Sequence, residues 1–110
     1  MSFAIILTKS FKRTAKPLLK RFASFEKDLA ALGEELTANP QAGEPLGRDC
    51  YKVRMSIAAK NKGKSGGARV ITCVKVVGET IFLLTIYDKS EQESISDQER
   101  DELLRENGLL

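Results

Sequence analysis

The stretch of this chain best suited to chemistry is residues 60–69, which reads KNKGKSGGAR. It combines four cationic side chains with three glycines and contains no acid. Glycine reaches backbone conformations that other residues avoid, and it lets a ligand approach the main chain closely. A phosphate backbone is the commonest partner for such a group of cations, and an ordinary solvated hairpin loop is the alternative. The cations that would face a ligand are Lys60, Lys62, Lys64 and Arg69.

Further cations and a phenol lie on the segments beside this stretch. Lys52 and Arg54 alternate with apolar residues, so they share the exposed side of a predicted strand. Tyr87 and Lys89 have the same phase at the end of another strand. We expect these groups to converge with Arg69 on one concave sheet surface, because a guanidinium can hold a phosphate through two hydrogen bonds. The alternatives are a packed aromatic ring at Tyr87 and a solubility charge at Lys89.

The chain contains no histidine, which excludes every catalytic scheme that needs an imidazole and every histidine-ligated zinc site. Cys50 and Cys73 are too few and too far apart in sequence for a metal site or a disulfide framework, and we interpret both as buried residues of a reducing compartment. Gly63-Lys64-Ser65 matches part of a P-loop, but that pattern needs a glycine where Ala58 stands and a helix where a strand follows. We therefore expect neither a metal nor a cofactor.

The first part of the chain predicts a strand and a helical region. The apolar run Phe3–Thr8 is typical of a buried strand. Apolar residues at spacings of three and four then predict helix over residues 11–22, with Pro17 inside it. Proline is tolerated only in the first turn of a straight helix. Either a new helix begins near Thr14, or one kinked helix continues through the proline.

The rest of the chain predicts a second helix, a linker, three strands and a short final helix. The second helix begins at Ser24 or Phe25 and ends before Asn39-Pro40, and residues 41–49 form a Pro/Gly linker. Alternation and apolar runs predict the strands, and a serine three residues before a glutamate predicts the final helix start. These features lie at Cys50–Ile57, Ala68–Val77, Thr80–Asp88 with a tight turn at Gly78-Glu79, and a capping box at Ser96–Glu99.

The predicted order β-α-α-β-β-β-α describes an α+β fold with a small, mainly antiparallel sheet of three or four strands. The N-terminal helix hairpin covers one face, and the other face is left partly open. Thr80–Tyr87 is apolar on both sides, which predicts an interior position in the sheet. Alternation along this strand places Phe82, Leu84 and Ile86 against the helix pair and Tyr87 on the open face.

The length of 110 residues predicts one domain, residues 1–110. The net charge is only +3, but residues 1–25 carry six bases and residues 50–78 carry seven, with no acid in either segment. This segregation predicts a basic face and an acidic face. The N-terminal apolar run is far below the length of a membrane span, so we expect a cytoplasmic protein with no membrane partner.

Three runs of the sequence together resemble a known family. They are Cys50–Arg54, Gly63–Val70 (GKSGGARV) and Leu84–Glu91 (LTIYDKSE). The combination is similar to the RelE/HigB branch of the RelE/ParE toxin superfamily, the toxins of bacterial type II toxin–antitoxin pairs. The resemblance covers nearly the whole chain and implies a RelE-like fold with the element order given above.

The resemblance implies a ribosome-dependent mRNA endoribonuclease, an mRNA interferase that inhibits translation. Members of this branch use clustered Lys and Arg with a C-terminal Tyr where ordinary ribonucleases use histidine, and the absence of histidine here agrees with that. Carried over by motif, the catalytic residues are Arg69, Tyr87, Lys89 and Lys64, and the RNA-binding residues are Lys52, Arg54, Lys60 and Lys62.

The implied partners are a cognate antitoxin, the ribosome and mRNA, with operator DNA contacted only through the antitoxin complex. Two other functions remain open. One is inhibition of DNA gyrase, as in the ParE branch, which lacks the nuclease cluster. The other is a nucleic-acid-binding module or inactive toxin homologue, which would keep the segregated charge without turnover.

Overall fold

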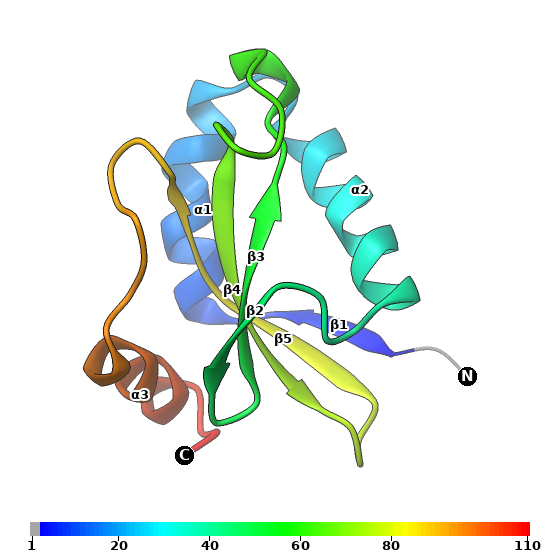
Figure 1. Ribbon diagram of the computed structural model, residues 1–110, viewed down its shortest axis with the longest axis vertical. Helices are drawn as coiled ribbons and strands as arrows, with labels where there is room; N and C mark the ends of the chain where they lie inside the picture. Colours follow the sequence, from blue (N-terminus) through cyan, green and yellow to red (C-terminus); the bar gives the residue numbers. More distant parts are fainter. Residues whose placement is uncertain (1–2) are drawn as a thin grey trace.

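The structure is a computed structural model that describes residues 3–110. It contains a five-stranded sheet with two helices on one face and one on the other (Figure 1). This is the predicted α+β fold, with one more strand than the largest sheet expected. The elements are β1 (Ala4–Leu7), α1 (Lys9–Arg21), α2 (Phe25–Ala38), β2 (Glu44–Gly47), β3 (Cys50–Met55), the 3₁₀ turn η1 (Ala58–Lys60), β4 (Ala68–Lys75), β5 (Thr80–Asp88) and α3 (Asp97–Glu106).

The strands lie in the order β1-β5-β4-β3-β2. β1 runs parallel to β5, and the other neighbours are antiparallel. The interior position expected for β5 is confirmed, since it pairs on both sides. The expected linker over residues 41–49 is wrong in part, because Glu44–Gly47 pairs with β3 as an edge strand. Proline and glycine are tolerated at a sheet edge, so this segment reads as a loop in sequence.

β1 corrects the expectation of a buried strand over Phe3–Thr8. The strand exists, but it lies at an edge, and the side chains of Ile6 and Leu7 are 44% and 37% exposed. A short apolar run predicts strand without telling an edge from the interior. The consequence is an apolar strand edge that remains open to solvent.

α1 is one helix that continues through Pro17, so of the two options the single helix is observed. Its first residue follows Thr8, whose hydroxyl accepts a hydrogen bond from the amide of Phe11. Pro17 is exposed, so the carbonyl that loses its helical partner can face water. α2 begins after Ser24 and ends before Asn39, as the sequence predicts.

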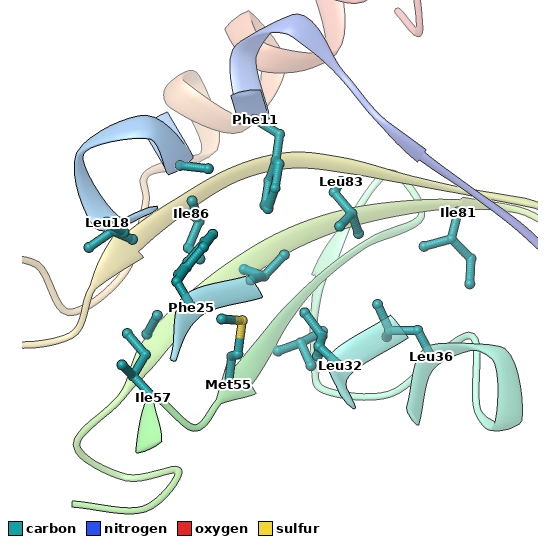
Figure 2. Packing of buried hydrophobic residues seen from close by; sticks show 14 of the residues in the cluster. Phe11, Leu18, Phe25, Leu32, Leu36, Met55, Ile57, Ile81, Leu83 and Ile86 are labelled. Atoms are coloured by element: carbon teal, nitrogen blue, oxygen red, sulfur yellow. The ribbon is translucent and has the colours of Figure 1, made fainter. Parts of the chain in front are cut away.

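The sheet separates two apolar clusters. Figure 2 shows the larger one, in which the α1 and α2 side chains Phe11, Leu18, Phe25 and Leu32 pack against Met55 and β5. The smaller cluster lies on the other face, where Leu104 of α3 is 1% exposed. α3 therefore covers part of the face that was expected to be open.

The side-chain phase expected along β5 is wrong at two positions. Ile86 faces the helix pair as predicted, but Phe82 and Leu84 pack on the α3 side. The cause is a β-bulge. Ile71 of β4 pairs with Thr85 and Thr72 pairs with Leu83, so Leu84 is the extra residue of β5. One extra residue on a strand reverses the alternation beyond it. Tyr87 lies beyond the bulge and packs on the α3 side, opposite the helix pair, as predicted.

Hydroxyl groups of the α1 segment satisfy the backbone of β5 at this bulge. Thr8 donates to the carbonyl of Leu83 at 2.7 Å, and the fully buried Ser10 donates to the carbonyl of Leu84. The hydroxyl of Thr14 accepts from the amide of Ile86 at 3.1 Å. These bonds replace the strand pairing that ends with β1, and they fix the part of β5 that leads to Tyr87.

α3 begins with the predicted capping box, in which Ser96 and Glu99 exchange side-chain to backbone hydrogen bonds. Arg100 donates to the carbonyl of Leu46 on β2, and Arg13 of α1 pairs with Glu106 at 2.9 Å. These contacts seat the helix on the sheet. Across residues 3–110, no helix combines the length and apolarity that crossing a membrane requires.

Candidate functional site

Three side chains from three neighbouring strands form a row across the sheet. Arg69 of β4 pairs in register with Arg54 of β3 on one side and with Tyr87 of β5 on the other. Directly opposite residues project from the same face of a sheet, about 5 Å apart. The structure therefore brings together two guanidinium groups and one phenol that the sequence predicts as site residues.

Arg69 is only 6% exposed, and its guanidinium is held by the main chain of the glycine-rich stretch. Its Nη1 donates to the carbonyls of Lys64 and Ala68, both at 3.0 Å, and its Nη2 donates to that of Ser65 at 3.3 Å. These bonds leave the Nε–H and part of the Nη2 amino group for a ligand. Arg69 thus fixes the loop and also borders the space beside it.

The loop passes close to β3 at Gly67. A Cβ atom at this position would lie 2.0 Å from the carbonyl oxygen of Met55, so no other residue fits without backbone movement. The carbonyl of Gly67 accepts from the amide of Lys89 at 3.1 Å, which ties the loop to the residue after β5. The glycine is therefore needed to place Lys64 and Arg69 beside the strands.

A cavity of about 590 Å³ lies beside β3, at the beginning of β2. Four of the predicted cations line it together with three glutamates. Two of the cations are ion-paired across it: Lys52 with Glu44 at 3.2 Å, and Lys64 with Glu35 at 2.9 Å. The charged lining residues are Lys52, Arg54, Lys64, Arg69, Glu35, Glu44 and Glu93.

Arg54 is the most available cation of this cavity. Its side chain is exposed, and within residues 3–110 it has no ion-pair partner. An anion entering the cavity can therefore bind Arg54 without displacing a carboxylate, whereas Lys52 and Lys64 must first release theirs. The cavity suits a polyanion that supplies several phosphates.

Tyr87 is the β5 member of the row and packs in the apolar cluster that α3 covers. Its hydroxyl donates to the carbonyl of Glu93 at 3.4 Å, and its ring lines two further cavities, of about 330 and 360 Å³, between α1, β5 and the segment before α3. Burial of the ring raises the pKa of Tyr87 above its ordinary value; the charge of Arg69 opposes this and that of Glu93 adds to it. The hydroxyl is therefore protonated at neutral pH and can donate a proton or a hydrogen bond.

A model of the RelE toxin of RelE/RelB toxin–antitoxin systems matches residues 4–107. The chain belongs to the RelE toxin family. It is therefore a toxin of the toxin–antitoxin class, and its fold is RelE-like, as the resemblance in the sequence implies. RelE-family toxins are in general endoribonucleases.

Solved structures share this RelE-like fold at low sequence identity. The free toxin RelE of E. coli, an arginine-to-alanine double mutant, matches with a TM-score of 0.61 at 16% identity, covering 96% of this chain and 98% of that one. The toxin–antitoxin complex RelBE2 of Mycobacterium tuberculosis matches at 0.55 and 19%, covering 80% and 99%. A conserved hypothetical protein of Helicobacter pylori matches at 0.51 and 19%, covering 81% and 97%.

Besides Tyr87, three predicted site residues of this RelE-family chain lie outside the cavity. Lys60 is turned away to the buried carboxylate of Asp88, at 2.7 Å. Lys62 is exposed, with its aliphatic part against Gly66. Lys89 is half-buried one residue after β5 and lines none of the cavities described here. A role in RNA binding or catalysis for these three stays a prediction.

The three glutamates of the cavity were not predicted from the sequence. Glu35 comes from α2, Glu44 from β2, and Glu93 from the segment between β5 and α3. They are far apart in the chain and lie in its acidic segments, which were predicted to form a separate face. The pairing of Glu44 with Lys52 depends on β2, so only recognition of that strand could have placed it.

Proposed function

We propose that this toxin cleaves mRNA on the ribosome, with the cavity beside β3 as its active site. The observation that carries the proposal is the row of Arg54, Arg69 and Tyr87 across three strands, flanked in the cavity by Lys52 and Lys64. Such a site binds a phosphodiester and offers one protonated phenol, without any imidazole. The proposed place of action is the cytoplasm, where ribosomes and mRNA are found.

The proposed reaction is attack of a ribose 2′-oxygen on the neighbouring phosphorus. The 2′-OH loses its proton to water as the 2′-O–P bond forms, the P–O5′ bond breaks, and the leaving 5′-oxygen takes up a proton. The products are a 2′,3′-cyclic phosphate and a free 5′-hydroxyl. Negative charge grows on the phosphoryl oxygens in the transition state. Arg54 and the free N–H groups of Arg69 lie at the cavity to receive it, and a donor of this kind contributes roughly 3–4 kcal/mol to catalysis.

The position of Tyr87 in the row is compatible with a base, an acid or a stacking role, but its pKa excludes the first. Because burial raises its pKa, the phenol is not the base that removes the 2′-OH proton at neutral pH. We assign it either the proton for the leaving 5′-oxygen or stacking against a base. Tyr87→Phe separates these roles, since it keeps the ring and removes only the proton.

Two carboxylates of the cavity compete with RNA for its lysines. Glu35 and Glu44 hold Lys64 and Lys52 in place in the free protein, at 2.9 and 3.2 Å. The glutamate of each pair is exposed to solvent, and ion pairs to an exposed carboxylate are worth at most about 1 kcal/mol. A phosphate backbone can displace them, and the two lysines then become RNA contacts.

The proposed protein partner is a cognate antitoxin, and we expect operator DNA to be contacted only through the complex with it. The M. tuberculosis neighbour RelBE2 is a toxin–antitoxin complex, and the family model describes toxins of RelE/RelB systems. The ribosome and mRNA are the proposed targets of the free toxin.

The test of this function compares Arg54→Ala and Tyr87→Phe with the wild-type toxin. We expect both variants to sediment with ribosomes at near wild-type occupancy. Arg54→Ala should lower the rate of mRNA cleavage by about 100-fold, the effect of removing one positioned donor, and Tyr87→Phe should do the same if the phenol is the acid but leave the rate near wild type if the ring only stacks. Cleavage at the wild-type rate by Arg54→Ala would show that the cavity is not the active site. A folded wild-type toxin without cleavage would favour gyrase inhibition or an inactive homologue.

A further inference from the structure

A second concave surface of the molecule lies between α1 and α2, and the function proposed above does not use it. It is a groove of about 280 Å³ that shares no residue with the cavity beside β3. The two helices diverge in Figure 1, and the groove lies between them. Its apolar lining includes Leu7, Phe11, Leu19 and Leu29.

The groove remains apolar where it reaches solvent. Phe11 forms its floor at 1% exposure, while Leu19 and Leu7 stand at its margins with 46% and 37% of their surface exposed. Leu7 ends β1, whose neighbour Ile6 is 44% exposed, so the apolar surface continues onto an open strand edge. Exposed apolar patches of this kind mark protein interaction sites more often than nucleic-acid sites.

The charge around the groove is one-sided. Lys12 and Lys16 line it from α1, and α1 carries no acid along its length, while Glu26 is the one acid in the lining. A partner that fits must place apolar side chains into the floor and acidic side chains opposite the lysines. RNA offers the negative charge, but it offers no aliphatic side chains for an apolar floor.

We propose that this groove binds an acidic, amphipathic helical segment of the antitoxin. This mode places an apolar stripe at spacings of three and four in the groove and glutamates or aspartates beside Lys12 and Lys16. The inference rests on the proposed toxin–antitoxin partnership and names the surface that supports it. Since the groove is separate from the cavity, it supplies affinity while other antitoxin residues cover the active site.

The test uses the toxin and its cognate antitoxin, each purified, with affinity measured by titration calorimetry and mRNA cleavage measured separately. Leu19→Asp puts a charge on the groove margin, and Lys16→Glu reverses the rim charge at an exposed position that tolerates substitution. Val77→Asp is the matched control, since Val77 is fully exposed at the β4–β5 turn, away from the groove.

We expect Leu19→Asp and Lys16→Glu to weaken antitoxin binding at least tenfold and to leave cleavage unchanged, while Val77→Asp behaves as wild type in both assays. Wild-type antitoxin affinity in both groove variants would overturn the proposal. Reduced ribosome-dependent cleavage with unchanged antitoxin affinity would also overturn it and assign the groove to the ribosome. The affinity for the antitoxin is measured without mRNA cleavage. A toxin that does not cleave mRNA would therefore refute the proposed activity, while the affinities of the groove variants would still test this proposal.

Discussion

Arg54 and Arg69 are directly opposite each other on β3 and β4, yet their side chains have different environments. Arg54 is exposed at the cavity, whereas Arg69 is buried and donates to three backbone carbonyls of the glycine-rich loop. Loss of Arg69 removes a donor from each of those carbonyls, and in the described part of the chain only that of Lys64 keeps a further hydrogen bond outside the strand pairing, from the amide of Gly67 at 3.4 Å. Loss of Arg54 breaks no ion pair within residues 3–110. We therefore expect both residues to contribute to the proposed cleavage, and Arg69 alone to contribute to folding stability.

The first prediction compares alanine substitutions at these two positions. Arg69→Ala is expected to lower the free energy of unfolding by about 2–3 kcal/mol, because it removes a buried guanidinium and its three hydrogen bonds to main-chain carbonyls. Arg54→Ala is the matched control and is expected to change it by less than about 0.5 kcal/mol. Urea denaturation measures both values. Equal stability of the two variants would show that Arg69 does not hold the loop.

Asp88 is the buried anion that positions the residues around the site. Its Oδ1 accepts from Lys60 at 2.7 Å and from the amide and hydroxyl of Ser90 at 2.9 and 2.8 Å. Burial raises the pKa of this carboxyl, but the hydrogen bonds from Lys60 and Ser90 outweigh it and bring the pKa to about 2. Lys60 is thus ion-paired within the fold, which its place in a cation-rich loop of the sequence does not reveal.

The second prediction follows from that pKa. The folded-state value of about 2 lies below the ordinary 3.8, so the stabilisation is present above pH 3.8 and is lost as the pH falls through 2. Asp88→Asn should cost about 2 kcal/mol at pH 7 and progressively less towards pH 2. Urea midpoints between pH 2 and 7 measure this. Glu34→Gln, at an exposed carboxylate, is the control, and a pH-independent cost at Asp88 would contradict the prediction.

Among the elements, those with local signals were predictable from sequence. Ser96 marks the start of α3 by a side-chain cap that involves only neighbouring residues, and Pro40 marks the end of α2. α2 begins after Ser24, one of the two starts expected, although the side chain of Ser24 makes no capping hydrogen bond. β2 was missed because Pro45 and Gly47 belong equally to loops and to edge strands. Whether such a segment forms an edge strand depends on the strand it pairs with, and the local sequence does not show that partner.

The bulge in β5 was also outside the reach of local patterns. Leu84 is one residue of a continuous apolar run, and nothing in that run shows where the extra residue lies. The bulge depends on hydroxyls more than seventy residues away, since Thr8 and Ser10 bond the carbonyls of Leu83 and Leu84. The position of Tyr87 could be predicted even so, because it was counted from Ile86, on the same side of the bulge.

The third prediction tests the role of these hydroxyls. Ser10→Ala removes the donor to the buried carbonyl of Leu84 and the acceptor for the side-chain amide of Asn107. The expected loss of unfolding free energy is about 1–3 kcal/mol, the cost of an unsatisfied buried group. Thermal or urea denaturation measures it. Lys12→Ala, at an exposed position of the same helix, should leave stability unchanged. Equal effects of the two substitutions would show that the hydroxyl of Ser10 does not stabilise the bulge.

For the molecule as a whole, the charge segregation of the sequence does not translate into two separate faces at the site. Acids from α2 and β2 pair with cations of the cavity, and Arg13 of the basic N-terminal segment pairs with Glu106 of α3. The folded chain therefore carries partly neutralised cations that a polyanion can recruit. The helix face adds an apolar groove with a basic rim, so the two proposed partners of the toxin have different surfaces available.

The most direct test of the central claim maps 5′ ends on a defined mRNA in a reconstituted translation reaction, with and without ribosomes. We predict cuts within the reading frame that require ribosomes, carry 5′-hydroxyl ends, and disappear with Arg54→Ala, while the folded variant still binds ribosomes. Cuts of equal strength without ribosomes would identify a free ribonuclease. The absence of cuts by a folded wild-type protein would contradict the proposed activity itself.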